Sequence, residues 1–144
     1  MNAQELTTGN VVGVTHDKWG DMPAIVTSIN IEGDLSLRLL GVPRAYEEYK
    51  CVLTEVFPIR ITEKILLHNG FILPEHKEFY VLHRINNGDN AIRLTKGIDS
   101  WTAEFFVSHP EEVMLTPTIK NINYLHELQN AFKLTAGQDL PLKI

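Results

Sequence analysis

The chain has 144 residues, of which 44% are hydrophobic and 22% are charged, and this balance excludes a mostly disordered protein. Its length allows one domain with a sizeable core. The formal net charge of −5 argues against a non-specific nucleic-acid binder, because such a protein needs a cationic face. The single cysteine, Cys51, excludes a disulfide framework within the chain, and its apolar neighbours predict a small buried side chain.

The first third of the chain is rich in strand-forming residues. Short alternating segments separated by Gly and Asp turns predict antiparallel strands. The predicted strands are residues 9–16, 24–31 after Pro23, and 35–39, with a fourth near Cys51 and turns at 17–21 and 32–34. This pattern is typical of a small SH3-like barrel or curled sheet.

A short helix is predicted in the middle of the chain. Thr62 is a suitable N-cap, and Glu63 suits the positive N-terminal end of a helix. Ile65 and Leu66 begin an apolar side, and Asn69 followed by Gly70 predicts the helix end.

A second β region follows this helix. Its predicted strands are residues 78–85, 91–94, 101–107 and 113–116, with a strong turn pattern at 86–90. We expect Trp101 to be buried. We also expect the strand at 101–107 to be an edge strand, whose apolar residues would favour a homodimer.

The last quarter of the chain predicts an amphipathic helix. Asn123 is the expected N-cap, and Gly137 is placed where a left-handed residue would end the helix. The apolar face comprises Leu125, Leu128 and Phe132, with Tyr124 and Ala131 at its border and Gln129, Asn130 and Lys133 pointing elsewhere. We expect this face to close the protein's own core, and recognition of a partner is the alternative.

These elements predict an α+β protein. It has a small antiparallel SH3-like barrel or curled sheet, a short central helix, further antiparallel strands and a C-terminal helix. We expect a single domain over residues 1–144, with two lobes, 1–57 and 58–144, as the alternative. The chain lacks a signal-peptide pattern and any apolar run of transmembrane length, so we expect a cytoplasmic protein.

The sequence offers little catalytic chemistry. Its six histidines lack the spacing of a zinc motif, so we expect no metal and no cofactor. Cys51 has no evident activating base. His126 lies in the first turn of the predicted terminal helix. There it is interpreted as a structural hydrogen-bonding residue, with a contact to a ligand or partner as the alternative.

Aromatic residues in loops are the main indication of a binding site. Trp19 lies in a turn, where it either contacts a ligand or caps the open end of the barrel. The polar segment that contains Arg44, Tyr46, Tyr49 and Lys50 is interpreted as a contact surface. The predicted binding residues are Trp19, Arg44, Tyr46, Tyr49, Lys50 and His126.

Three segments of the chain have recognisable sequence patterns. Residues 5–12 (ELTTGNVV) are similar to the pattern ELRIGNxV, and residues 57–71 (FPIRITEKILLHNGF) to PIPLTEEWLLKFGF. Residues 124–140 (YLHELQNAFKLTAGQDL) are similar to YVHQLQNLYFALTGEEL. By these patterns the chain resembles an uncharacterised family of small proteins from gut-type bacteria, their phages and mobile elements. The resemblance implies a fold and a genomic setting and gives no activity.

The leading hypothesis is a non-enzymatic binding protein of phage or mobile-element type. It would bind a protein partner or a small ligand, and it would inhibit a host defence system by covering a protein surface or sequestering a signalling nucleotide. One alternative is a nucleic-acid-binding small barrel that uses Trp19, Arg38, Arg44 and Lys50. Another is a hydrolase that uses His126 or Cys51.

Overall fold

The computed structural model describes residues 5–85, 90–108, 114–115 and 117–144. The chain divides into two compact units. The first comprises the described residues up to Arg60 together with Tyr124–His126 and Ile144, and the second comprises those of Ile61–Asn123 and Glu127–Lys143. None of the helices in the described part of the chain is long and apolar enough to cross a membrane.

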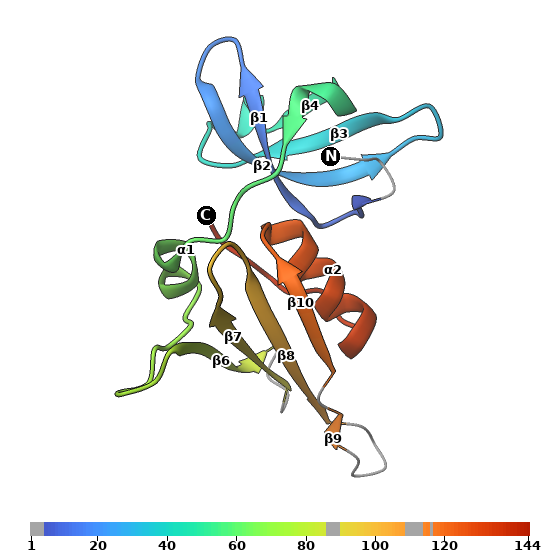
Figure 1. The fold of residues 1–144 in the computed structure, drawn as a ribbon. Coiled ribbons are helices and arrows are strands. Elements are labelled where there is room, and N and C mark those ends of the chain that lie inside the picture. The colour runs from blue at the N-terminus through green and yellow to red at the C-terminus, as the bar shows by residue number, and fades with distance from the viewer. Residues whose placement is uncertain (1–4, 86–89, 109–113, 116) are drawn as a thin grey trace. The chain divides into compact units, whose positions relative to one another are not determined.

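The first unit is an antiparallel five-stranded sheet curled into a half-barrel (Figure 1). Its strands follow the order β4-β3-β2-β1-β5. They are β1 (Val11–His16), β2 (Gly20–Ile29), β3 (Asp34–Leu39), β4 (Glu48–Val52) and β5 (Val56–Phe57). Two 3-10 turns, η2 (Arg44–Tyr46) and η3 (Leu53–Glu55), flank β4.

The alternation of apolar residues explains which face of this sheet is buried. In β3, Leu35, Leu37 and Leu39 are at most 2% exposed, whereas Asp34 and Arg38 are exposed. The other core residues are Leu6, Val12, Val14, Ala24, Val26, Cys51 and Val56, with Trp19, Met22, Ile29, Val42, Tyr49 and Leu53 packed against them. The predicted burial of Cys51 is confirmed.

Strand β2 begins four residues before the prediction, which started it at residue 24 after Pro23. Gly20 pairs with His16 and Pro23 pairs with Gly13, so only residues 17–19 form the turn. Gly20 has a φ of 70°, which glycine adopts without strain, and this allows the short turn to close.

The second unit contains an antiparallel sheet of order β10-β8-β7-β6, with β9 paired to β8. Its strands are β6 (Phe79–Ile85), β7 (Asn90–Lys96), β8 (Trp101–Ser108), β9 (Met114–Leu115) and β10 (Thr118–Ile122). The predicted turn at 86–90 lies outside the described residues except for Asn90. Trp101 is 6% exposed, which confirms its predicted burial.

Strand β8 is an interior strand, so its prediction as an edge strand was wrong. It pairs with β7 on one side and with β10 and β9 on the other. The sequence did not predict β10, in which a register shift between Ile119 and Ile122 interrupts the alternation. Because β10 covers the edge of β8, that strand no longer supports the expectation of a homodimer.

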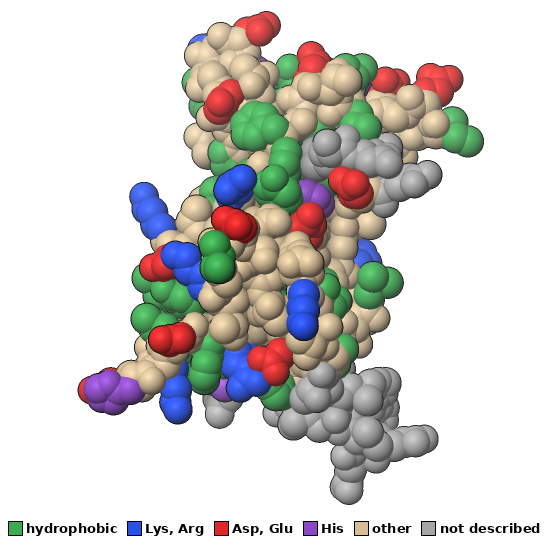
Figure 2. Space-filling model, viewed as in Figure 1, with side chains coloured by type: hydrophobic (Ala, Val, Ile, Leu, Met, Phe, Trp, Pro, Cys, Tyr) green, Lys and Arg blue, Asp and Glu red, His purple; other side chains and the backbone are tan. Residues whose placement is uncertain are grey.

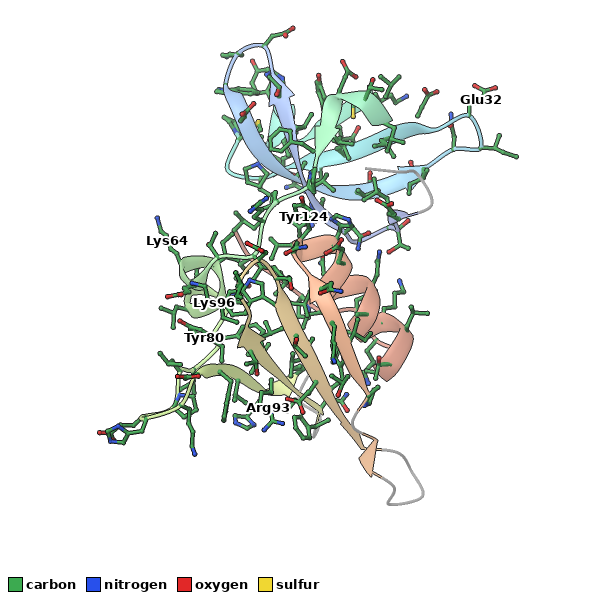
Figure 3. All side chains as sticks on the ribbon, in the orientation of Figure 1. Glu32, Lys64, Tyr80, Arg93, Lys96 and Tyr124 are labelled. Atoms are coloured by element: carbon green, nitrogen blue, oxygen red, sulfur yellow. The ribbon has the colours of Figure 1, made fainter. Side chains whose placement is uncertain are left out.

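Helix α1 (Glu63–His68) forms where the sequence predicted it. The Thr62 hydroxyl accepts a hydrogen bond from the Ile65 N–H at 3.3 Å, as expected of an N-cap. Lys96 Nζ lies 2.7 Å from Glu63 Oε1, and this ion pair joins α1 to β7. Figure 3 shows Lys96 and Tyr80 beside α1, and hydrogen bonds from both lower the pKa of Glu63.

Helix α2 (Leu125–Ala136) buries the predicted stripe. Leu125, Leu128 and Phe132 are fully buried, and the Phe132 ring lies 6.3 Å from that of Phe105 in β8. Gly137 has a φ of 66°, which confirms the predicted left-handed helix end.

Two details of α2 differ from the prediction. The helix begins at Leu125, and the Asn123 N–H donates to Glu127 Oε2 at 2.7 Å. Gln129 is 6% exposed and does not point away from the core. Its amide donates to the Leu140 carbonyl at 3.2 Å, because the buried C-terminal tail covers this side of the helix.

Candidate functional site

The hairpin between β1 and β2 holds the centre of the candidate site. Its turn is fixed by two hydrogen bonds, from the Trp19 N–H to the His16 carbonyl at 3.2 Å and from the Lys18 N–H to His16 Nδ1 at 3.1 Å. Across the hairpin, the Thr15 hydroxyl lies 2.6 Å from Asp21 Oδ1. The positions of Lys18 and Trp19 are therefore set by the backbone of a tight turn.

Four rings from the hairpin, η2 and β4 form the aromatic cluster, which we define as His16, Trp19, Tyr46 and Tyr49. The His16 ring lies 4.5 Å from that of Trp19 and 5.2 Å from that of Tyr49. The rings of Trp19 and Tyr46 are 5.4 Å apart and inclined at 75°, an edge-to-face contact. The cluster thus joins segments that are up to 33 residues apart in the chain.

A cation lies against two of these rings. Lys18 Nζ is 5.0 Å from the ring centre of Trp19 and 5.1 Å from that of Tyr46. Both distances are within the range of a cation–π interaction. The ring faces of Trp19 and Tyr46 therefore already hold an ammonium group from the chain itself.

The four rings differ in burial, and this difference separates a structural part from an accessible part. Trp19 and Tyr49 are half-buried and pack against the core of the first unit. Tyr46 is 51% exposed, and the Tyr46 N–H donates to the Pro43 carbonyl at 2.8 Å within the η2 turn. Trp19 accordingly packs against the core while it contacts the exposed ring of Tyr46.

A depression of about 340 Å³ lies beside the cluster on β3 and β4. Tyr49 and Lys50 line it together with Arg38, Glu47 and Glu48, so it presents both signs of charge. Its remaining lining residues are Thr27, Ser36 and Leu37. Burial raises the pKa of the Tyr49 hydroxyl, and Glu55, Cys51 and Asp17 raise it further, so Tyr49 is a neutral phenol at pH 7.

The first unit carries an excess of negative charge. Residues 5–60 contain eight acidic against five basic side chains. Figure 2 shows acidic side chains, in red, at several points on the part of this unit that is in view. A positively charged group is therefore attracted to this unit over a distance of about one Debye length, roughly 8–10 Å.

The structure brings three of the six predicted binding residues into one cluster, namely Trp19, Tyr46 and Tyr49. Lys50 follows Tyr49 in β4 and lines the adjacent depression, and Arg44 is exposed at the start of η2. His126 belongs to α2, is 2% exposed and stacks on Tyr124 with ring centres 5.9 Å apart. Its burial favours the structural interpretation over a direct contact with a partner.

Sequence reasoning did not assign His16 and Lys18 to the site. Lys18 directly precedes Trp19 in the chain, and His16 is one of the six histidines. Their spacing around the turn at residues 17–19 was an available indication, because residues at the two ends of a tight turn lie close together. The contact between His16 and Tyr49 depends on strand pairing and has no local indication in the sequence.

Reactive groups within the described residues do not converge in this cluster. Burial, followed by Glu55, raises the pKa of the Cys51 thiol to about 11, so that its nucleophilic thiolate is scarce at pH 7. No three His, Cys, Asp or Glu side chains of the described ranges are placed to hold a metal ion. The arrangement of rings and cation is suited to binding.

Comparison of the chain with protein-family models, curated proteins and solved structures finds no match. Its function is therefore inferred from the geometry and chemistry of the aromatic cluster.

Proposed function

We propose that this chain is a non-enzymatic binding protein that recognises a protein partner through its aromatic cluster. The observation that carries the proposal is the exposed ring of Tyr46, which is held edge-to-face against Trp19 at 5.4 Å. Tyrosine and tryptophan are the residue types most enriched among side chains that dominate interface energies. A half-exposed Tyr supported by a core-packed Trp has the composition and placement of such a residue pair.

The local structure around the cluster supports this proposal. Backbone hydrogen bonds of the hairpin and of the η2 turn hold the main chain of Trp19 and Tyr46, and the Trp19 side chain packs against the core. A surface that is already ordered loses little conformational entropy when a partner binds, and this favours affinity. The adjacent depression, with Lys50 and Arg38 beside Glu47 and Glu48, would provide the polar rim of the same interface.

The resemblance of three segments to a phage-associated family supports a more specific version. In that setting the partner is a component of a host defence system, and the chain inhibits it by covering a functional surface. Sequestration of a signalling nucleotide is the competing version. Because the first unit has more acidic than basic side chains, it repels phosphate groups, and we favour a protein partner.

The experiment compares Tyr46→Ala with Ile31→Ala as the matched control. Ile31 is fully exposed in the turn between β2 and β3 of the same unit, so its truncation removes apolar surface outside the cluster. A partner captured by cross-linking is purified and titrated with each variant by calorimetry. We expect Tyr46→Ala to weaken binding at least tenfold and Ile31→Ala to leave it unchanged.

Equal affinity of the two variants would refute the aromatic cluster as the binding surface. A panel of cyclic nucleotides is titrated in parallel. Tight binding of any of them by the wild-type chain, lost in Tyr46→Ala, would replace the protein partner with the nucleotide version.

A further inference from the structure

The ammonium group of Lys18 occupies a site formed by two inclined rings. Trp19 and Tyr46 meet at 75°, and Lys18 Nζ is almost equidistant from them, at 5.0 and 5.1 Å. Two or more aromatic faces around one cation are the arrangement by which proteins recognise ammonium ligands. The first unit therefore contains an ammonium site that its own side chain fills.

The two rings are the contacts that the structure gives for this ammonium group. Among the ion pairs given for the described residues, none involves Lys18. Lys18 is an exposed side chain, and a lysine has several rotatable bonds, so its ammonium can leave the rings at small cost. The contact is consequently exchangeable.

Removal of the Lys18 side chain from the rings leaves the turn intact. The residue contributes to the turn through its backbone N–H, which donates to His16 Nδ1, and the Trp19 N–H supplies the second hydrogen bond. Neither bond uses the lysine side chain. Another ammonium group can therefore replace that of Lys18 while the two rings keep their places.

We propose that Trp19 and Tyr46 bind an ammonium group presented by the partner, an exposed lysine, which displaces Lys18 from the rings. This inference rests on the proposed function, because it names the chemistry of the partner group that the aromatic cluster recognises. Lys18 acts as an internal competitor for the ammonium site in the free protein. The acidic excess of the first unit attracts the incoming cation and repels anionic competitors.

The test uses the full chain labelled with ¹⁵N and tetramethylammonium chloride as the probe, exchanged for sodium chloride at constant ionic strength. The indole N–H signal of Trp19 reports binding. The signal of Trp101, which is buried in the second unit, is the internal reference. tert-Butanol serves as an uncharged probe of similar shape.

Lys18→Ala empties the site, and we expect it to bind tetramethylammonium about three- to sixfold more tightly than the wild type. The cation–π interaction of an exposed lysine is weak but keeps Lys18 on the rings for most of the time. The factor is the competition that is removed when this side chain is absent. Lys18→Arg keeps a cation on the rings and should bind no more tightly than the wild type. Tyr46→Ala should abolish the shift of the Trp19 signal in either background.

The source of the ammonium group is tested with short peptides that differ only in lysine or norleucine at one position. Methylammonium is titrated for comparison. If the Lys18→Ala variant binds the lysine peptide more tightly than methylammonium, the result supports a protein ligand. If the variant binds the two equally, the protein source is overturned. The inference is overturned as a whole if tetramethylammonium does not shift the Trp19 signal of Lys18→Ala, or if tert-butanol shifts it equally. If Tyr46→Ala nevertheless loses the protein partner, the proposed function stands and only this inference fails.

Discussion

The contact between Gly13 and Phe57 gives the sharpest prediction about stability. Gly13 is buried in β1 and pairs with Phe57 of β5 across the sheet. A Cβ atom at Gly13 would lie 2.1, 2.5 and 2.6 Å from three carbons of the Phe57 ring. Favourable contacts between carbon atoms are about 3.5–4.0 Å, so the ring would have to move by more than an ångström.

The magnitude follows from two opposing terms. Overpacking of a well-packed site costs about 1–3 kcal/mol. The backbone of Gly13 is outside the left-handed region, so an alanine is not strained there and gains about 0.4–1 kcal/mol from the lower entropy of the unfolded chain. The difference between the two terms is about 0–2.6 kcal/mol, and because the Phe57 ring is half-buried and its far end makes the contact, we expect Gly13→Ala to lower the free energy of unfolding by about 1 kcal/mol.

A double-mutant cycle with Phe57→Ala isolates the steric term. All variants carry Trp101→Phe, so that urea unfolding followed by fluorescence reports on Trp19, which packs against the core of the first unit. In the Phe57→Ala background the ring is absent, and Gly13→Ala should be neutral or slightly stabilising. A similar loss in both backgrounds would refute the reasoning, because the cost would then have no connection to the ring.

Three further predictions concern the second unit and the single cysteine. Phe132→Ala, at a fully buried position of α2, should lower the free energy of unfolding in urea by about 3–5 kcal/mol. Leu134→Ala, at 87% exposure on the same helix, should change it by less than about 0.5 kcal/mol. Similar costs for the two variants would contradict the buried stripe. Because the hydrogen bond from Lys96 lowers the pKa of Glu63 below its ordinary 4.5, the stabilisation is present above the unfolded-state pKa and is lost as the pH falls through the folded-state pKa. Glu63→Gln should therefore flatten the acid side of the pH–stability curve, and an unchanged curve would argue against the ion pair. Since the pKa of Cys51 is raised to about 11, its thiol should react with a disulfide reagent at pH 8 far more slowly in the folded chain than in urea, and equal rates would show that it is accessible.

Local patterns in the sequence predicted the elements whose cause is local. The alternation of Leu35, Leu37 and Leu39 predicted β3, and the Thr62 cap predicted the start of α1. The buried stripe of α2 followed from helical periodicity and ended at Gly137 as expected. Each of these features depends on residues within one or two turns of helix or one strand.

The features that the sequence did not predict depend on contacts between distant segments. The interior position of β8 requires β10, whose alternation is broken by a register shift. The burial of Gln129 requires the tail near Leu140 to return over α2. In both cases a segment distant in the sequence determines the environment of the residue or strand, so the local periodicity of the sequence cannot predict it.

In the aromatic cluster, packing against the core of the first unit decides which residue is the better probe of binding. Trp19 was predicted either to cap the core or to contact a ligand, and its packing against the core means that its removal would change stability and binding together. Tyr46, at 51% exposure, contributes far less to the core. In the proposed exchange, the group that a partner cation displaces is the Lys18 ammonium, which lies 5.0 Å from the Trp19 ring centre and 5.1 Å from that of Tyr46. Loss of affinity in Tyr46→Ala with unchanged stability is therefore the result that separates binding from folding.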